Sequence, residues 1–152
     1  MMELDDTDRK ILRVVQTEAN LPLEEIGARV GLSRNACWRR IRTMETEGII
    51  TRRVALVDPD AVHCPLSVFL QIRAARHDAD WARRFSDTTR DLPQILGVYR
   101  MTGDQDYLIR AQVRDMADYD RLYQILISRV DMARISASFV MEKIKDTTAL
   151  PV

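Results

Sequence analysis

The sequence predicts an α+β protein built from an N-terminal winged helix-turn-helix and a C-terminal ferredoxin-like βαββαβ domain. Three observations predict this fold. Before Gly48, a helix, a short helix, a glycine-containing turn and an arginine-rich helix follow one another, which is the helix-turn-helix order. Residues 49–57 are rich in β-branched residues, as a strand would be. From residue 62 onward, strand-like and helix-like apolar patterns follow in the order βαββαβ.

The composition is that of an ordinary globular chain, with 46% hydrophobic and 30% charged residues among 152. No apolar run approaches the roughly 18 residues that would span a bilayer. The N-terminus is acidic and lacks an apolar signal core, so we expect a cytoplasmic protein with no membrane partner. Cys37 and Cys64 are too few for a disulfide framework.

Charge is balanced over the whole chain but not along it. The sequence has 23 basic and 23 acidic residues, which argues against a wholly basic nucleic-acid binder. Between Arg34 and Arg53, however, six arginines stand against two glutamates. A local positive field of this kind is expected when one segment contacts phosphates.

The first two helices are predicted from their caps and breakers. Residues 4–20 form the first helix, with Asp5 or Thr7 as its cap. Pro22 ends it, because the residue before a proline is pushed out of the helical region. Residues 23–30 then form a short second helix.

The third helix begins at Ser33, a good N-cap, and ends at Gly48. One face carries Cys37, expected to be a small core residue, and Arg40 faces inward, where an ion pair or a phosphate contact is expected. Arginine and asparagine read guanine and adenine edges in the major groove, so the outer face predicts double-stranded DNA as a partner. A solvated charged face is the plainer alternative. The candidate DNA-binding residues are Ser33, Arg34, Asn35, Trp38, Arg39 and Arg42.

The second half predicts a four-stranded antiparallel sheet with helices on one face only. The open face must be covered, so we expect two such domains to associate face to face. The predicted domains are residues 1–48, a strand and linker at 49–61, and residues 62–152. The predicted strands are 66–74, 95–101, 107–113 and 134–144, and the predicted helices are 77–91 and 116–129.

Motifs in both halves resemble the Lrp/AsnC family, the feast/famine transcriptional regulators of bacteria and archaea. The first half carries L-D-D-T-D-R-K-I-L, I-G-A-R-V-G-L-S-R-N-A-C-W-R-R-I and E-G-I-I. The second half carries T-G-D-Q-D-Y-L-I-R. The resemblance covers essentially the whole chain. A narrower resemblance, through A-C-W-R-R-I and S-F-V-M-E-K-I-K-D-T-T-A-L-P-V, is to the subgroup that senses cysteine and switches on its degradation.

The resemblance implies a RAM/ACT-like second domain that binds an amino-acid effector between subunits and assembles homodimers, commonly to octamers. It also implies that the glycine-aspartate turn lies at the effector pocket. A carboxylate there could pair with the ammonium of an amino acid, and backbone N–H groups could hold its carboxylate. A plain hairpin turn is the alternative. The candidate effector-binding residues are Thr102, Gly103, Asp104 and Asp106, and cysteine is the first candidate effector.

Two other functions stay open at this point. The first is an enzyme on a ferredoxin-like dimer, but the only histidines are His63 and His77, and no metal-binding spacing or phosphate-binding glycine loop appears. We therefore expect no catalytic residue, no metal and no cofactor. The second is an architectural protein whose oligomer binds DNA without a ligand, which a ligand-independent, sequence-indifferent affinity would favour.

Overall fold

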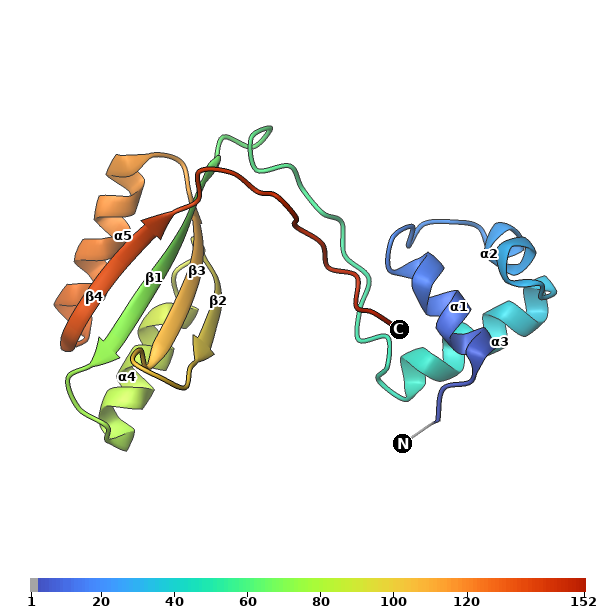
Figure 1. The fold of residues 1–152 in the computed structure, drawn as a ribbon, viewed down its shortest axis with the longest axis horizontal. Coiled ribbons are helices and arrows are strands. Elements are labelled where there is room, and N and C mark those ends of the chain that lie inside the picture. The colour runs from blue at the N-terminus through green and yellow to red at the C-terminus, as the bar shows by residue number, and fades with distance from the viewer. Residues whose placement is uncertain (1–2) are drawn as a thin grey trace. The chain divides into compact units, whose positions relative to one another are not determined.

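The computed structural model describes residues 3–152, which divide into two compact units (Figure 1). The first unit contains the chain up to Leu56 together with Lys145–Val152, and the second contains Val57–Ile144. The predicted α+β fold is confirmed, with a helical first unit and a mixed second unit. Among the described residues, no helix is long and apolar enough to cross a membrane.

Three helices form the first unit: α1 (Asp6–Val15), α2 (Leu23–Val30) and α3 (Arg34–Thr46). Asp5 caps α1, and its carboxylate accepts the Asp8 N–H while the Asp8 carboxylate accepts the Asp5 N–H. The helix ends five residues before the predicted Asn20, because the Thr17 hydroxyl bonds to backbone carbonyls and competes with helical pairing. The apolar core comprises Ile11, Leu12, Val15, Ile26, Cys37, Ile41 and Met44.

Two glycines shape the turn between α2 and α3. Gly31 ends α2 with φ +75°, the left-handed conformation that favours glycine. Gly27 lies inside α2, and a Cβ atom there would be 2.6 Å from the backbone oxygen of Leu32. The Leu32 N–H also donates to the Gly27 carbonyl at 2.9 Å. The tight turn therefore depends on Gly27, which the sequence analysis did not single out.

The segment after Gly48 does not form the predicted strand. Ile49 and Ile50 both donate their N–H groups to the Met44 carbonyl, and residues 51–58 run extended without ladder pairing. A β-rich sequence forms a stable strand only when a partner strand completes its hydrogen bonds. No partner strand is found in the described part of the chain, so the helix-turn-helix has no β wing. The second unit also starts and ends differently from the expected 62–152, because Lys145–Val152 belong to the first unit.

The second unit has the predicted βαββαβ order. Its elements are β1 (Leu66–Ala74), α4 (Ala79–Arg90), β2 (Ile95–Arg100), β3 (Tyr107–Val113), α5 (Met116–Arg129) and β4 (Met132–Phe139). The strands form an antiparallel sheet in the order β2-β3-β1-β4. β4 ends at Phe139, before the predicted 144, because its partner β1 begins near the paired residue Val68.

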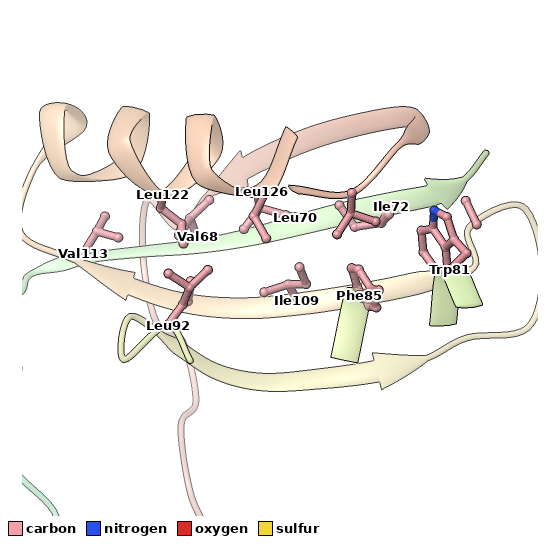
Figure 2. Close-up of a cluster of buried hydrophobic side chains, with 13 residues drawn as sticks. Val68, Leu70, Ile72, Trp81, Phe85, Leu92, Ile109, Val113, Leu122 and Leu126 are labelled. Carbon is pink, nitrogen blue, oxygen red and sulfur yellow. The ribbon is translucent and has the colours of Figure 1, made fainter. Parts of the chain in front are cut away.

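The two faces of the sheet differ in chemistry. Val68, Leu70 and Ile72 of β1 point into an apolar core with Leu122 and Leu126 of α5 (Figure 2). The strand register places the opposite set of side chains on the face that α4 and α5 do not cover. That open face includes Phe69, Gln71, Leu108, Arg110, Ser136 and Ser138.

Candidate functional sites

The outer face of α3 presents every residue predicted to contact DNA. All six side chains are exposed, and Trp38 keeps 56% of its surface accessible. Ser33 begins the helix, and its hydroxyl accepts the Ala36 N–H at 3.3 Å. The opposite face carries Cys37, Ile41 and Met44 into the core. Burial therefore follows the division into an inner and an outer face that the sequence predicts for α3.

The exposed arginines of this face are available to an external anion. Arg34 lies 2.8 Å from Glu24, and Arg42 lies 3.5 Å from the half-buried Glu45, but the arginine side chain of each pair is solvent-exposed. Exposed ion pairs contribute little, so phosphate or a base edge can replace the glutamates at small cost. Arg39 has no ion-pair partner among the residues that the structure describes.

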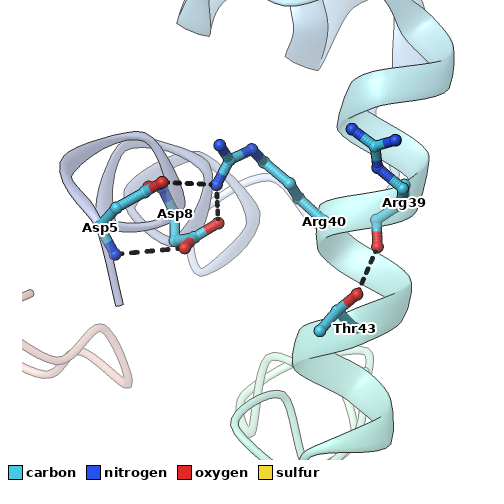
Figure 3. A network of polar contacts seen from close by, with 5 residues as sticks. All are labelled: Asp5, Asp8, Arg39, Arg40 and Thr43. Carbon is cyan, nitrogen blue, oxygen red and sulfur yellow. Dashed lines mark hydrogen bonds and ion pairs between the residues drawn. The ribbon is translucent and has the colours of Figure 1, made fainter. Parts of the chain in front are cut away.

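Arg40 is held in a different environment from Arg39 (Figure 3). Its guanidinium lies 2.8 Å from carboxylate oxygens of both Asp5 and Asp8, and Asp8 is only 1% exposed. The hydrogen bonds that Arg40 donates to Asp8 and then to Asp5 raise the pKa of Arg40. The backbone N–H of Asp8, followed by Arg40, lowers the pKa of Asp5. Arg40 therefore forms the ion pair that joins α3 to the start of α1.

Two further arginines, Arg52 and Arg53, follow α3 in the chain. Arg53 donates to Glu45 at 3.1 Å and to the Ala19 carbonyl at 3.3 Å, so it ties this segment to α3 and to the loop between α1 and α2. Arg52 is exposed. A shallow depression of about 220 Å³ lies on α3 itself, lined by Trp38, Arg39, Arg42, Thr43, Thr46 and Glu47. The surface thus combines fork-shaped donors with an indole, the chemistry of a nucleic-acid interface.

The glycine-aspartate turn divides the four predicted effector residues. Thr102, Gly103 and Asp104 are exposed, and Gly103 has φ +105°. Asp106 is instead built into the sheet. Its carboxylate accepts the Ala74 N–H at 2.8 Å, and its backbone N–H donates to the Ile72 carbonyl. Asp106 thus fixes the end of β1, and Asp104 presents its carboxylate to solvent.

His77 and Gln105 lie beside this turn and were not predicted as site residues. The His77 Nε2 atom is 3.9 Å from the Asp106 carboxylate. The Gln105 side-chain oxygen is buried without a hydrogen-bond partner among the described residues. No sequence signal joins His77 to Asp106, because only the sheet brings the end of β1 next to the start of β3.

Ser136 and Cys37 have structural surroundings that account for them. Ser136 donates to Gln71 at 3.2 Å on the open sheet face. Cys37 is fully buried, and burial raises the pKa of its thiol, so it is a neutral core residue. Within residues 3–152, no group of three or more His, Cys, Asp or Glu side chains is arranged to hold a metal ion.

Family models match both units of the chain. A model of the AsnC-type helix-turn-helix domain matches residues 4–45, and a model of the Lrp/AsnC ligand binding domain matches residues 67–150. The two matches together include all but the last residue of α3 and the whole glycine-aspartate turn.

Curated proteins and solved structures agree with these matches. The glutamate uptake regulatory protein of Zymomonas mobilis is 44% identical, over 99% of this chain and 92% of its own. The DNA-binding transcriptional activator DecR of Escherichia coli is 39% identical, over 98% and 99%. An AsnC family transcriptional regulator from Agrobacterium tumefaciens is 45% identical with a TM-score of 0.93, over 97% of each chain. A Neisseria meningitidis regulator solved as its L-Met complex is 35% identical with a TM-score of 0.94, over 98% and 97%.

Proposed function

The chain belongs to the Lrp/AsnC family of DNA-binding transcriptional regulators, and from this premise we propose that it reads a specific DNA sequence through α3 and responds to an amino acid at the 102–106 turn. Its named relatives are transcriptional regulators, and it is not an enzyme. The regulator would act in the cytoplasm, where its DNA is.

The single observation that carries the DNA-reading proposal is the contrast between Arg39 and Arg40. Arg40 is bound to two carboxylates, whereas Arg39 stands exposed on the same helix (Figure 3). In a helix-turn-helix, the N-terminal residues of the second helix contact base edges in the major groove. Ser33, Arg34 and Asn35 occupy that end of α3, and Trp38, Arg39 and Arg42 follow on the outer face.

The effector proposal rests on the chemistry of the turn. The exposed Asp104 carboxylate can pair with an ammonium group, and the backbone at Gly103 can approach a carboxylate closely. We place cysteine first among the candidates because of the subgroup resemblance described above. Methionine comes second, since a 35% identical relative was solved with L-Met. Both are sulfur-containing amino acids, and Thr102 and Asp106 would complete the wall of the pocket.

The open sheet face supports a proposal about assembly. Phe69 and Leu108 lie on it among polar side chains, so a second copy of the domain would cover apolar area there. Such homodimers, and octamers formed from them, would hold helix-turn-helix units for pseudo-palindromic half-sites. An effector bound between subunits would change DNA affinity by about 1–3 kcal/mol, the usual size of such coupling.

Fluorescence anisotropy tests both parts of the proposal. Labelled DNA from upstream of the protein's own gene is titrated with protein at fixed salt, with and without each amino acid. One amino acid should shift the affinity about 5- to 150-fold. Asp104→Ala should abolish that shift and keep DNA binding, whereas Asp120→Ala, an exposed control on α5, should keep both.

The other outcomes separate the alternatives. Specific binding that no amino acid shifts would remove the effector proposal. Binding that is ligand-independent and equal on random DNA would favour the architectural protein instead. A normal ligand response in Asp104→Ala would show that the pocket lies elsewhere.

A further inference from the structure

Residues from the C-terminal side of the chain lie against α1 (Figure 1). The Gln16 side chain makes two hydrogen bonds to the backbone of Leu150. Leu150 donates its N–H to Gln16 Oε1 at 2.7 Å, and Gln16 Nε2 donates to the Leu150 carbonyl at 3.2 Å. Arg13 Nε donates to the Val152 carbonyl at 2.6 Å. Three polar contacts thus dock the segment on one helix.

The docked segment is also part of an apolar surface. Val152 packs against the core formed by α1, α2 and α3. A groove of about 690 Å³ lies beside the segment, and Leu150 and Val152 line it together with Leu12, Val15 and Ile50. The amide of Gln16 pairs with both polar groups of one backbone residue, as a neighbouring strand would, so it fixes the register of the segment.

Docking of the C-terminal segment on the first unit affects how that unit is connected to the second. The chain leaves the first unit after Leu56 and returns to it at Lys145, shortly after β4. The first unit is therefore connected to the second by two chain segments, provided that residues 147–152 stay docked. A body held by two segments can adopt fewer orientations than a body held by one.

The returning segment and the proposed effector turn are connected through one strand pair but lie at its opposite ends: Ala74 pairs with Met132 at the start of β4, and Val68 pairs with Phe139 at its end. Asp106 holds the N–H of Ala74 at the end of β1. β1 pairs along its length with β4, and β4 leads into the returning segment. A displacement of β1 at Ala74 would reach that segment only along the β1–β4 ladder, and this ladder is the route by which the turn would bias docking of the segment.

We propose that residues 147–152 form a strap that docks on Arg13 of α1 and on Gln16, the C-cap of that helix, restricts the orientations of the DNA-binding unit, and transmits the state of the effector domain to it. The segment docked beside α1 is thus part of the same chain, and it forms one wall of the groove. Transmission rests on the proposed amino-acid response, whereas restriction of orientation does not.

The test uses the full chain carrying Gln16→Ala, with Gln124→Ala as the matched control on an exposed part of α5. Hydrogen exchange at the Leu150 amide should speed up at least tenfold in Gln16→Ala and stay unchanged in Gln124→Ala. Anisotropy then compares DNA with one half-site and DNA with two, both defined by footprinting the upstream region. A freed strap should weaken two-site binding about tenfold and leave single-site binding unchanged.

Each result has one meaning. Equal losses on one and two half-sites would show that the segment only stabilises the fold of the unit, and the strap would be rejected. A Leu150 amide that exchanges at the wild-type rate, or a two-site affinity equal to that of Gln124→Ala, would also reject it. In a third outcome, Gln16→Ala shows faster Leu150 exchange and weaker two-site binding, but no amino acid changes the DNA affinity of the wild-type protein. That outcome would keep the restraint on orientation and remove the effector response.

Discussion

Arg39 and Arg40 are neighbours in the sequence, but their surroundings give them opposite roles. Arg40 neutralises the buried carboxylate of Asp8, and Arg39 is exposed on the outer face of α3. A charged hydrogen bond to a buried partner stabilises a fold by more than an exposed one, because its loss leaves a desolvated charge. The pair therefore allows stability and DNA binding to be separated.

We expect Arg40→Ala to lower the free energy of unfolding by about 1.5–3 kcal/mol, because the Asp8 carboxylate loses its cation. Arg39→Ala should change stability by less than about 0.5 kcal/mol, as surface substitutions do. The same change should weaken specific DNA binding by about 1–3 kcal/mol. Urea unfolding and anisotropy measure the two effects, and a destabilised Arg39→Ala protein would contradict the assignment.

The sequence predicts the outer face of α3 well and the partner of Arg40 only in part. The 3.6-residue period separates Cys37 and Ile41 from Arg39, and burial follows that period. The same period places Arg40 on the inner side of the helix but does not identify the carboxylate that it contacts. Asp8 lies 32 positions away, and only the packing of α1 on α3 brings the two together.

At the scale of elements, the turn between α2 and α3 sets the position of the candidate reading helix. Gly27 has its Cα against the Leu32 carbonyl, and Gly31 takes the left-handed conformation at the end of α2. Any side chain at position 27 would force the two helices apart. Space rather than backbone conformation is the requirement at Gly27.

Gly27→Ala should therefore destabilise the first unit by about 1–3 kcal/mol, the usual cost of overpacking a tight contact. It should also weaken DNA binding, because α3 is displaced. Thermal unfolding followed by circular dichroism measures the first effect. Glu25→Ala, on an exposed position of the same helix, is the control and should unfold like the wild type.

The start of α5 has a pH-dependent contribution to stability. The backbone N–H of Arg114, assisted by the side chains of Arg114 and Arg121, lowers the pKa of the buried Asp118 carboxyl. A carboxyl whose folded pKa is lowered stabilises the protein above its unfolded pKa, here near 3.8, and loses that contribution as the pH falls through the folded value.

Asp118→Asn should accordingly reduce stability at pH 7 and show a smaller further loss below pH 3.8 than the wild type does. Urea unfolding between pH 7 and pH 3 measures how the free energy of unfolding of each protein, the variant and the wild type, changes with pH. Parallel curves for the variant and the wild type would mean that Asp118 does not titrate in this way.

The sequence predicts paired elements better than unpaired ones. The four strands of the sheet alternate or are apolar along their length, and each has a partner in the chain. Residues 49–57 have the same β-rich composition, yet they form no ladder in the structure. Composition reports a preference for extended backbone, whereas a strand also requires a neighbour.

At the scale of the whole molecule, zero net charge coexists with a local surplus of arginine around α3. Arg53 is tied to Glu45 and the Ala19 carbonyl, but Arg52 is exposed. A phosphate contact releases counterions, so it appears in the salt dependence of binding. A base contact appears mainly in the sequence preference.

Arg52→Ala should reduce the slope of log affinity against log salt by about 1 for each subunit bound, with little change in sequence preference. Anisotropy titrations from 50 mM to 200 mM salt measure the slope. A slope equal to that of the wild type would mean that Arg52 does not meet a phosphate.

The glycine-aspartate motif predicts the turn at residues 102–106 but not the different roles of its two aspartates. The glycine-aspartate sequence predicts a turn at residues 102–106, and the structure has one. It does not show that Asp106 closes the sheet through Ala74 while Asp104 stays exposed. The two aspartates are alike in sequence and differ because only one faces the end of β1.

The chain passes from the first unit to the second and back again, and this order has a consequence for synthesis on the ribosome. The first unit includes Lys145–Val152, which are translated only after the entire second unit. At about 5–20 residues per second, α1, α2 and α3 wait on the order of ten seconds for the segment that completes them. The nascent chain therefore emerges with the surface of α1 that this segment later contacts uncovered, and that surface is open to chaperones during the interval.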